Sequence, residues 1–295
     1  MPPIPTPHPA VEASAVDPLP FGRCSPDRLC ATILAVTRRC PEGWAAKRLA
    51  FFLRSMGVKI LRGRPVDTQS LGARMRLRPY NNVAEKRLLF TPQYFDPRER
   101  ALIASRLCED FIFIDAGSSV GGYALSLAAL APRARILAIE PLPEVFERLV
   151  YNIDANAFAN VKALSCALAD RDGEVTLFVN AYNRGESSVR VVSGDWRGAR
   201  LRVPAKSLLS VLREEGYRRL DAIKLDIEGA EDLVLDAYFR DAPAALWPRL
   251  IVMEFNLRRD GVGLEERLRA LGYREILRTV ENVAYERDAQ SGIAA

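Results

Sequence analysis

The stretch Phe111-Ile-Phe-Ile-Asp-Ala-Gly-Ser-Ser-Val-Gly-Gly122 joins an apolar run to a turn rich in glycine and serine. The run Phe111–Ile114 has the length and composition of a strand that is buried on both faces. The segment Tyr123–Leu130, which follows the turn, is predicted to be a helix. A strand, a glycine turn and a helix in this order are typical of an open α/β sheet, in which ligands bind at the carboxyl ends of the strands.

Alternating strands and helices continue towards the carboxyl end of the chain. The stretch 173–192 is expected to be an insertion or an extra hairpin. Residues 273–277 and 282–285 are two strands too close together for a helix between them, so they are expected to pair antiparallel. This order predicts a doubly wound sheet with a terminal hairpin. The other expected strands are 135–139, 161–167, 221–225 and 250–255, and the expected helices are 144–156, 205–215, 230–237 and 264–271.

The chain is expected to divide into four segments. Within the second of them, helices are predicted in 27–60 and a short strand or hairpin in 70–82. The third begins with a helix over 97–108, for which Asp96 is the expected N-cap. The four segments are a disordered proline-rich leader at 1–22, a basic extension of helices and short strands at 23–95, a catalytic domain at 96–288 and a frayed tail at 289–295.

The segment 44–56 in the basic extension is predicted to be an amphipathic helix. We expect its apolar face to pack on the main domain. Peripheral contact with an anionic membrane is the alternative, because basic residues lie among the apolar ones. The apolar residues of this segment are Trp44, Leu49, Phe52, Leu53 and Met56.

The composition excludes several classes of protein. No uncharged stretch reaches the roughly 18 apolar residues that a membrane span needs, and no secretory signal is visible. The five cysteines form no CxxC pair, which argues against a disulfide framework or a structural zinc site and favours a reducing, cytoplasmic location. The only histidine is His8, in the leader, so a Ser-His-Asp triad and a histidine-bound metal are excluded.

The net charge of +5 is unevenly distributed along the 295 residues. Residues 1–110 hold 18 basic and 10 acidic residues, a balance of +8, whereas the remainder holds 24 and 27, a balance of −3. This pattern favours an acidic catalytic domain that carries a basic extension.

The glycine turn discriminates between two kinds of ligand. A dinucleotide fingerprint GxGxxG would require glycine at position 119, where this chain has Ser119. Asp115 would repel a diphosphate but fits beside a cation or an ammonium group. S-adenosylmethionine carries a sulfonium and an amino group and no phosphate. Glu140 ends the next strand, 23 residues after Gly117, where an acid is placed to bind ribose hydroxyls.

Five ordered blocks of sequence together resemble the FkbM-type family of class I S-adenosylmethionine-dependent methyltransferases. The resemblance extends over roughly 85–285. It implies a seven-stranded, mostly parallel, Rossmann-like α/β sheet, S-adenosylmethionine as the methyl donor, and a hydroxyl acceptor on a sugar or polyketide. The family often has Gly-Ala-Asn where this chain has Gly117-Ser-Ser119, and we expect donor binding to survive this difference. The blocks are Phe113–Gly122, Ala138-Ile-Glu-Pro141, Asn152…Asn156…Asn160-Val161, Ala167–Glu174 and Ile223–Glu231.

The resemblance also implies roles for residues around the donor. Ser119 keeps a short polar side chain in the turn. For Asp170, an ordinary Asp-Arg-Asp-Gly turn is the alternative to a binding role. The resemblance implies that Asp115, Gly117 and Gly121 line the methionine end, that Glu140 holds the ribose, that Pro141 and Leu142 lie against the adenine, and that Asp170 lies near the adenine amino group.

The catalytic candidates are Asp226 and Glu228, which follow the expected strand 221–225. An alcohol must lose its proton when it attacks a methyl group, and without a usable histidine the proton acceptor is expected to be a carboxylate. Side chains two apart in an extended chain share a face, and Lys224 would join them. Three interpretations stay open: one carboxylate is the general base, both hold Mg²⁺ with Glu254 or Asn256, or both position the ligands or cap the next helix.

These features predict an S-adenosylmethionine-dependent O-methyltransferase that acts on a hydroxyl, with a sugar of a glycan or of a glycosylated metabolite as acceptor. The alternatives are a nucleic-acid or protein methyltransferase and a non-catalytic adaptor that retains the fold. A nucleic-acid partner is not expected, because Asp226-Ile-Glu-Gly229 replaces the Asp/Asn-Pro-Pro-Tyr/Phe motif of amino-methylating DNA enzymes. The oligomeric state is left open by the sequence.

Overall fold

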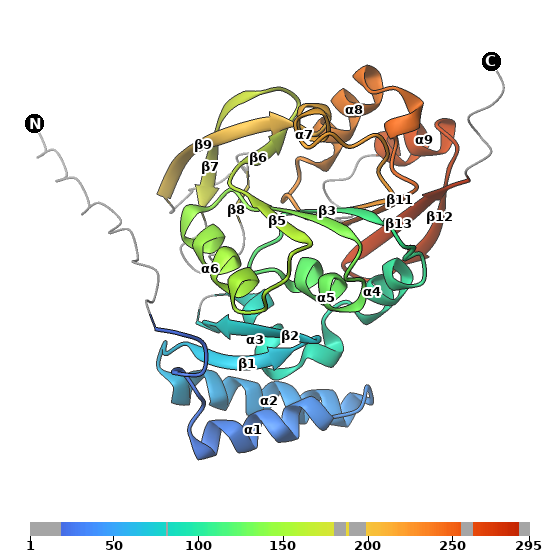
Figure 1. The fold of residues 1–295 in the computed structure, drawn as a ribbon. Coiled ribbons are helices and arrows are strands. Elements are labelled where there is room, and N and C mark those ends of the chain that lie inside the picture. Colours follow the sequence, from blue (N-terminus) through green and yellow to red (C-terminus); the bar gives the residue numbers. More distant parts are fainter. Residues whose placement is uncertain (1–18, 81, 180–186, 189–198, 255–261, 289–295) are drawn as a thin grey trace, which may run out of the picture.

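The structure is a computed structural model that describes residues 19–80, 82–179, 187–188, 199–254 and 262–288. Its centre is a seven-stranded sheet in the order β12-β13-β11-β10-β3-β4-β5 (Figure 1). All neighbours are parallel except β13, which is antiparallel to both β11 and β12. The strands are β3 (Ile112–Ala116), β4 (Arg135–Ile139), β5 (Val161–Leu164), β10 (Ala222–Leu225), β11 (Leu250–Glu254), β12 (Tyr273–Arg278) and β13 (Asn282–Arg287).

This topology confirms the predicted seven-stranded, mostly parallel α/β sheet with an antiparallel terminal hairpin. The hairpin differs from a simple one in one respect, because its second strand, β13, is inserted between β11 and β12. The chain runs outward from β3 to β5 and then returns to β10 on the other side of β3. The carboxyl ends of β3 and β10 therefore flank the point where the strand order reverses, which is where open α/β sheets bind ligands.

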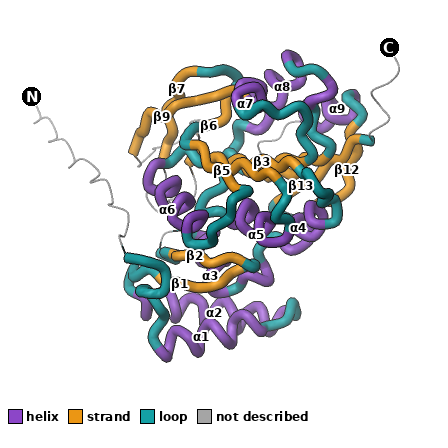
Figure 2. Tube along the Cα trace, in the orientation of Figure 1, coloured by secondary structure: helices purple, strands orange, loops and turns teal. Residues whose placement is uncertain are grey.

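Helices cover both faces of the sheet, and each face has its own hydrophobic core (Figures 1 and 2). Successive residues of β3 alternate between the two cores, as the period of two in a strand requires: Phe113 enters one core and Ile112 and Ile114 the other. The helices are α4 (Pro97–Ala104), α5 (Gly122–Leu130) and α6 (Pro143–Asp154) on one side, and α7 (Leu208–Glu214), α8 (Glu231–Asp241) and α9 (Val262–Ala270) on the other.

A second, four-stranded sheet corrects two sequence expectations. The strand expected at 161–167 ends at Leu164, and the chain then moves to the second sheet. The helix expected at 205–215 begins only at Leu208, where Ser207 accepts a hydrogen bond from the Ser210 backbone N–H. The residues before Leu208 form a strand, in which exposed and buried side chains alternate. The order of the second sheet is β6-β9-β7-β8, with β6 (Ala167–Ala169), β7 (Gly173–Val179), β8 (Ser187–Ser188) and β9 (Ala199–Ser207).

The basic extension is built into the main domain. It comprises α1 (Arg28–Arg39), α2 (Trp44–Leu61), a hairpin of β1 (Val66–Ser70) and β2 (Ala73–Leu77), and α3 (Val83–Phe90), a helix that the sequence analysis did not predict. The hairpin lies a few residues before its predicted position. The extension and the central sheet share one hydrophobic core.

Two asparagines, Asn152 in α6 and Asn156 in the turn that follows it, fasten the hairpin to the sheet. The Asn152 amide oxygen accepts a hydrogen bond from the Arg76 backbone N–H at 2.7 Å, and its amide nitrogen donates to the Val120 carbonyl at 3.1 Å. One turn later, Asn156 accepts from the Arg74 N–H at 2.7 Å. Asn152 thereby ties β2 to the turn that follows β3, and Asn156 adds a second contact to β2.

The predicted packing of the amphipathic helix is wrong for most of its large apolar residues. In α2, the buried residues are Ala50, Gly57 and Leu61, and a Cβ at Gly57 would overlap the Phe90 ring of α3. The small residues therefore face the protein, and the large ones on the opposite side are left in solvent. The exposed large residues of α2 are Trp44, Leu49, Phe51, Phe52 and Met56. Among the described residues, no helix combines the length and hydrophobicity needed to cross a lipid bilayer.

Candidate active site

A crevice of about 310 Å³ opens at the carboxyl ends of the central strands, at the point where the strand order reverses. Its floor comes from the ends of β3, β4 and β10, and its walls come from the second sheet, from α3 and from the turn before β13. The lining residues are Val83, Ala84, Arg87, Leu88, Phe95, Asp96, Asp115–Ser119, Gly122, Tyr123, Ile139–Pro141, Cys166–Leu168, Leu177, Lys224, Asp226–Glu228, Glu254, Glu281 and Asn282.

The glycine turn satisfies four of its backbone N–H groups internally. Gly117 and Ser118 both donate to the Ile139 carbonyl at 3.0 Å, and Gly121 donates to the Ser118 carbonyl at 2.9 Å. The Ser119 N–H donates to the Glu140 carboxylate at 2.9 Å. These four groups are the kind that would otherwise cradle a phosphate, so this turn is poorly suited to bind a diphosphate.

Gly117 is needed for contact within the chain. Its φ of +78° lies in the left-handed region, and a Cβ there would overlap the carbonyl oxygen of Asp226. The family resemblance implied that this glycine lines the methionine end of the donor. The structure places it in the crevice wall but gives it a different function, which is to let the loop after β10 approach the turn after β3.

Asp115 ends β3 with its side chain buried. Its carboxylate accepts hydrogen bonds from the Ser118 hydroxyl at 2.9 Å and from the Ala124 backbone N–H at 3.0 Å. Burial raises the pKa of Asp115 to about 6, although these hydrogen bonds and the nearby Lys224 ammonium oppose the rise. Lys224 is its register partner on β10.

Glu140 follows β4 and is also buried. One carboxylate oxygen accepts from the Ser119 N–H and the other from the Leu142 N–H, both at 2.9 Å, so the group is held at its two ends. Burial raises the pKa of Glu140 to about 7, against the effect of both hydrogen bonds. Beside it, the buried Ser119 hydroxyl has no hydrogen-bond partner among the described residues.

Of the three predicted adenine contacts, only Pro141 lies in the crevice lining. Pro141 lines the crevice, whereas Leu142 is packed in the core under the sheet and Asp170 lies outside the lining. Asp170 follows β6, which has left the central sheet for the second one, and its charge acts instead near Arg240 of α8. Residues 166–168 form the crevice wall on that side.

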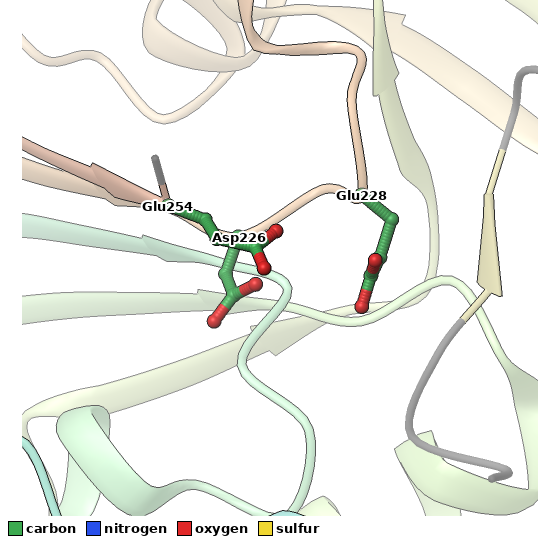
Figure 3. Close-up of side chains that lie close together, drawn as sticks. All are labelled: Asp226, Glu228 and Glu254. Carbon is green, nitrogen blue, oxygen red and sulfur yellow. The ribbon is translucent and has the colours of Figure 1, made fainter. Parts of the chain in front are cut away.

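The three carboxylates of the predicted catalytic region converge (Figure 3). One oxygen each of Asp226, Glu228 and Glu254 lie within 4.8 Å of one another. The prediction assumed an extended chain through Asp226 and Glu228, but β10 ends at Leu225 and Glu228 has a left-handed φ of 55°. A turn, therefore, directs both side chains into the crevice. Asn256 lies outside the described residues.

Lys224 supplies a buried positive charge beside these acids. Its side chain is fully buried, and its ammonium donates to the Asp226 carboxylate at 3.2 Å and lies 5.7 Å from the centre of the Tyr123 ring. Burial alone would lower the pKa of Lys224, but Asp226 and other nearby acids outweigh it and raise the pKa above its ordinary value. The lysine is thus a fixed cation at the crevice floor.

The polar wall formed by the extension was missed in the sequence analysis. Asp96 stands before α4 but does not cap it; its carboxylate accepts from Arg87 at 2.8 Å and from the Tyr123 hydroxyl at 3.0 Å. Arg87 also pairs with Glu281 at 2.6 Å, which links α3 to the turn before β13. No sequence motif signals this arrangement, because Tyr123 and Glu281 lie 27 and 194 residues from the partners that they contact.

Comparison with known proteins points to one family. Residues 115–275, more than half of the chain, match the family described as "Methyltransferase FkbM domain". The match covers β3 to β12, and so includes the turn, Glu140 and the three converging carboxylates.

Individual relatives share about a third of the aligned residues with this chain. The protein named Methyltransferase sdnD of Sordaria araneosa is 33% identical over 175 residues, which are 50% of this chain and 65% of that protein. AMB antimetabolite synthetase AmbE of Pseudomonas aeruginosa is 31% identical over 187 residues, 52% of this chain and 9% of that protein. The chain thus spans less than two thirds of the length of these relatives. Among solved structures, a human methyltransferase 10 domain containing protein is 13% identical, with a TM-score of 0.44 over 82% of this chain and 98% of that one.

Proposed function

Because the chain belongs to the FkbM methyltransferase family, we propose that it transfers a methyl group from S-adenosylmethionine to a hydroxyl group, and that the acceptor is a sugar of a glycan or of a glycosylated metabolite. The observation that carries the donor assignment is the pair of buried carboxyl groups, Asp115 and Glu140, beside a turn in which four backbone N–H groups are already hydrogen-bonded. Such a site favours a cation with hydroxyl groups over a diphosphate.

The residues present fit this donor. In the proposed arrangement, Glu140 accepts hydrogen bonds from the ribose hydroxyls, and the Ser119 hydroxyl gains the partner that it lacks within the described protein. Asp115 faces the amino group of the methionine end. Apolar side chains of Ile139, Pro141 and Leu168 supply the wall that a purine ring needs.

The bound donor would supply an electrophilic methyl group, and the protein must align an acceptor oxygen with it and remove the hydroxyl proton. We assign the proton to the Asp226 carboxylate, which Lys224 holds in the crevice. Glu228 and Glu254 are placed to accept hydrogen bonds from neighbouring hydroxyls of the same acceptor. Alignment of this kind accounts for much of the catalysis in a displacement reaction.

The charge of the crevice supports a neutral, hydroxyl-rich acceptor. The acids Asp226, Glu228, Glu254 and Glu281 line the part of the crevice that lies beyond the donor carboxylates. Carboxylates accept hydrogen bonds from sugar hydroxyls but repel phosphates, so a nucleic-acid backbone is disfavoured here. Arg87 is already paired with Asp96 and Glu281.

The catalytic assignment is tested by Asp226→Asn. We expect turnover to fall by about 10²–10⁴-fold, the usual contribution of a general base, while the donor Kd stays within about twofold. Asp170→Asn is the matched control, because Asp170 lies outside the crevice, and it should leave both quantities unchanged. Loss of donor affinity in Asp226→Asn, with turnover of the bound donor intact, would refute the role of Asp226.

The acceptor class is tested separately with methyl-labelled donor. The full chain is incubated with fractionated cell-envelope glycans, with total RNA and with total protein. Label in a glycan fraction, released as an O-methyl sugar on hydrolysis, supports the proposal. Label confined to RNA or protein supports the corresponding rival, and binding of the donor without transfer to any fraction favours the adaptor.

A further inference from the structure

Helices α1 and α2 lie on the far side of the hairpin β1–β2 from the central sheet (Figure 1). Their outer side chains form an exposed apolar surface. In α2, the side chains of Trp44 and Phe52 are among the most exposed large apolar groups described, at 73% and 63%. We call this surface the α1–α2 face. Its exposed large apolar residues are Leu29, Val36, Trp44, Leu49, Phe52 and Met56.

Packing among the described residues leaves this face in solvent. Trp44, Arg48 and Phe52 follow one another at helical spacing of four residues, and Lys59 lies two turns further along the same side. The opposite side of α2, at Ala50 and Gly57, packs against the protein. A row of aromatic and basic side chains therefore projects outward from α2.

The charge of the face has one sign. Helices α1 and α2 together contain seven basic residues and no acidic one. The acids that flank them are Asp27, which caps α1 and pairs with Arg64 at 3.3 Å, and Glu42. Arg38 turns inward to the Leu89 carbonyl. The exposed basic residues are Arg28, Arg39, Arg48 and Lys59.

We propose that the α1–α2 face binds the surface of an anionic phospholipid bilayer as a peripheral contact. Aromatic side chains enter the boundary between headgroups and acyl chains, while arginine and lysine on the same helix pair with lipid phosphates. The Arg48 guanidinium, 4.8 Å from the centre of the Trp44 ring, places both kinds of group at one spot. A second copy of the chain fits less well, because a two-fold contact would bring two positively charged faces together.

Helix α3 connects the proposed membrane-binding helices to the crevice. Helix α3 packs against α1 and α2, and its residues Val83, Ala84 and Arg87 also line the crevice. One layer of helix thus separates the proposed lipid-binding face from the crevice wall. The proposal depends on the surface alone and does not require the proposed function to be correct.

The test is flotation of the full chain with lipid vesicles. We expect the protein to float with vesicles of phosphatidylcholine mixed with phosphatidylglycerol, to float at least about tenfold less with phosphatidylcholine alone, and to be partly released by salt. Trp44→Ala with Phe52→Ala should reduce flotation by about tenfold or more. The matched control is Leu130→Ala with Val280→Ala, which removes exposed apolar groups elsewhere and should leave flotation unchanged.

Three results would overturn the proposal. The first is no flotation with anionic vesicles, and the second is flotation that the Trp44/Phe52 variant leaves unchanged. The third is a dimer in light scattering that the same variant dissociates while vesicle binding is absent, which would assign the face to a second copy. If that variant unfolds, Arg48→Glu with Lys59→Glu tests the same face through its charge, with loss of flotation expected.

Discussion

Burial gives the two carboxyl groups at the ends of β3 and β4 an unusual affinity for protons. Asp115 and Glu140 each accept two hydrogen bonds from the protein, yet desolvation still raises their pKa values, to about 6 and about 7. A bound cation would compensate for the desolvation and favour the ionised form of both groups. The proton affinity of the crevice should therefore be coupled to the binding of the donor.

Donor affinity should depend on pH through Glu140. Because the ionised carboxylate is the form that accepts both ribose hydrogen bonds, protonation below about pH 7 competes with binding, and the Kd should rise by about tenfold per pH unit below that value. Titration calorimetry between about pH 5.5 and pH 8.5 measures this. Glu140→Gln should bind weakly at every pH with a flatter profile; a wild-type Kd that does not vary with pH would contradict the assignment.

The left-handed backbone at Gly117 leads to a prediction about stability. Gly117→Ala should lower the free energy of unfolding by more than the about 1–2 kcal/mol that the left-handed conformation itself costs, because the new methyl group also overlaps the Asp226 carbonyl. Gly216→Ala is the control: its φ is +67° but an added Cβ would meet nothing within 4 Å. Urea denaturation of both variants measures the difference, and equal losses would show that the overlap is relieved without cost.

Elements with a strong local pattern were predicted well from the sequence. The buried strand β3, the alternation up to β11 and the antiparallel final pair follow from apolar runs, their spacing and the glycine turns. The strand β9 was mistaken for the start of a helix, because its partner β7 is needed to reveal it. Helix α3 was missed, and Asp96 was predicted to cap α4 although Arg87 and Tyr123 draw its side chain elsewhere.

In the candidate site too, the residues that were missed are those whose contacts lie far away in the sequence. Asp115, Glu140, Asp226 and Glu228 were found because each ends or follows a strand of one sheet. Arg87 was not, since its partner Glu281 is 194 residues away, and neither were the roles of Asn152 and Asn156. Asn152 and Asn156 bind backbone groups 76 and 82 residues away. Contacts at such separations leave no periodic trace in a single sequence.

The hairpin attachment predicts unequal effects of two similar substitutions, one in α6 and one in the turn after it. Asn152→Ala removes the partners of two buried backbone groups and should lower the free energy of unfolding by on the order of 3 kcal/mol. Asn156→Ala should cost about 1 kcal/mol, because water can replace its more exposed hydrogen bonds. Thermal and urea unfolding test this ranking, and a reversed order would show that Asn152 does not hold the hairpin.

At the scale of the whole molecule, the amino-terminal extension completes the crevice. Helix α3 supplies Arg87, which joins Asp96 near α4 to Glu281 before β13. The extension thus forms one wall of the crevice. We therefore expect the central sheet to hold the donor and the extension to contribute to the space for the acceptor.

This division predicts that Arg87→Gln separates the two ligands. The KM for the acceptor should rise by roughly tenfold, while the donor Kd stays within about twofold. Arg106→Gln is the control, because Arg106 also pairs with a glutamate of the terminal hairpin, Glu286 at 2.6 Å, but lies outside the crevice lining. A loss of donor affinity in Arg87→Gln without a change in acceptor KM would place the extension on the donor side instead.

The central claim is that this crevice binds a positively charged sulfur nucleoside and not a dinucleotide. Calorimetric titration of the full chain with S-adenosylmethionine and, separately, with NAD⁺ tests it most directly. We predict saturable one-to-one binding of S-adenosylmethionine, lost in Glu140→Ala, and no measurable heat with NAD⁺. Saturable binding of NAD⁺ with none of S-adenosylmethionine would contradict the account.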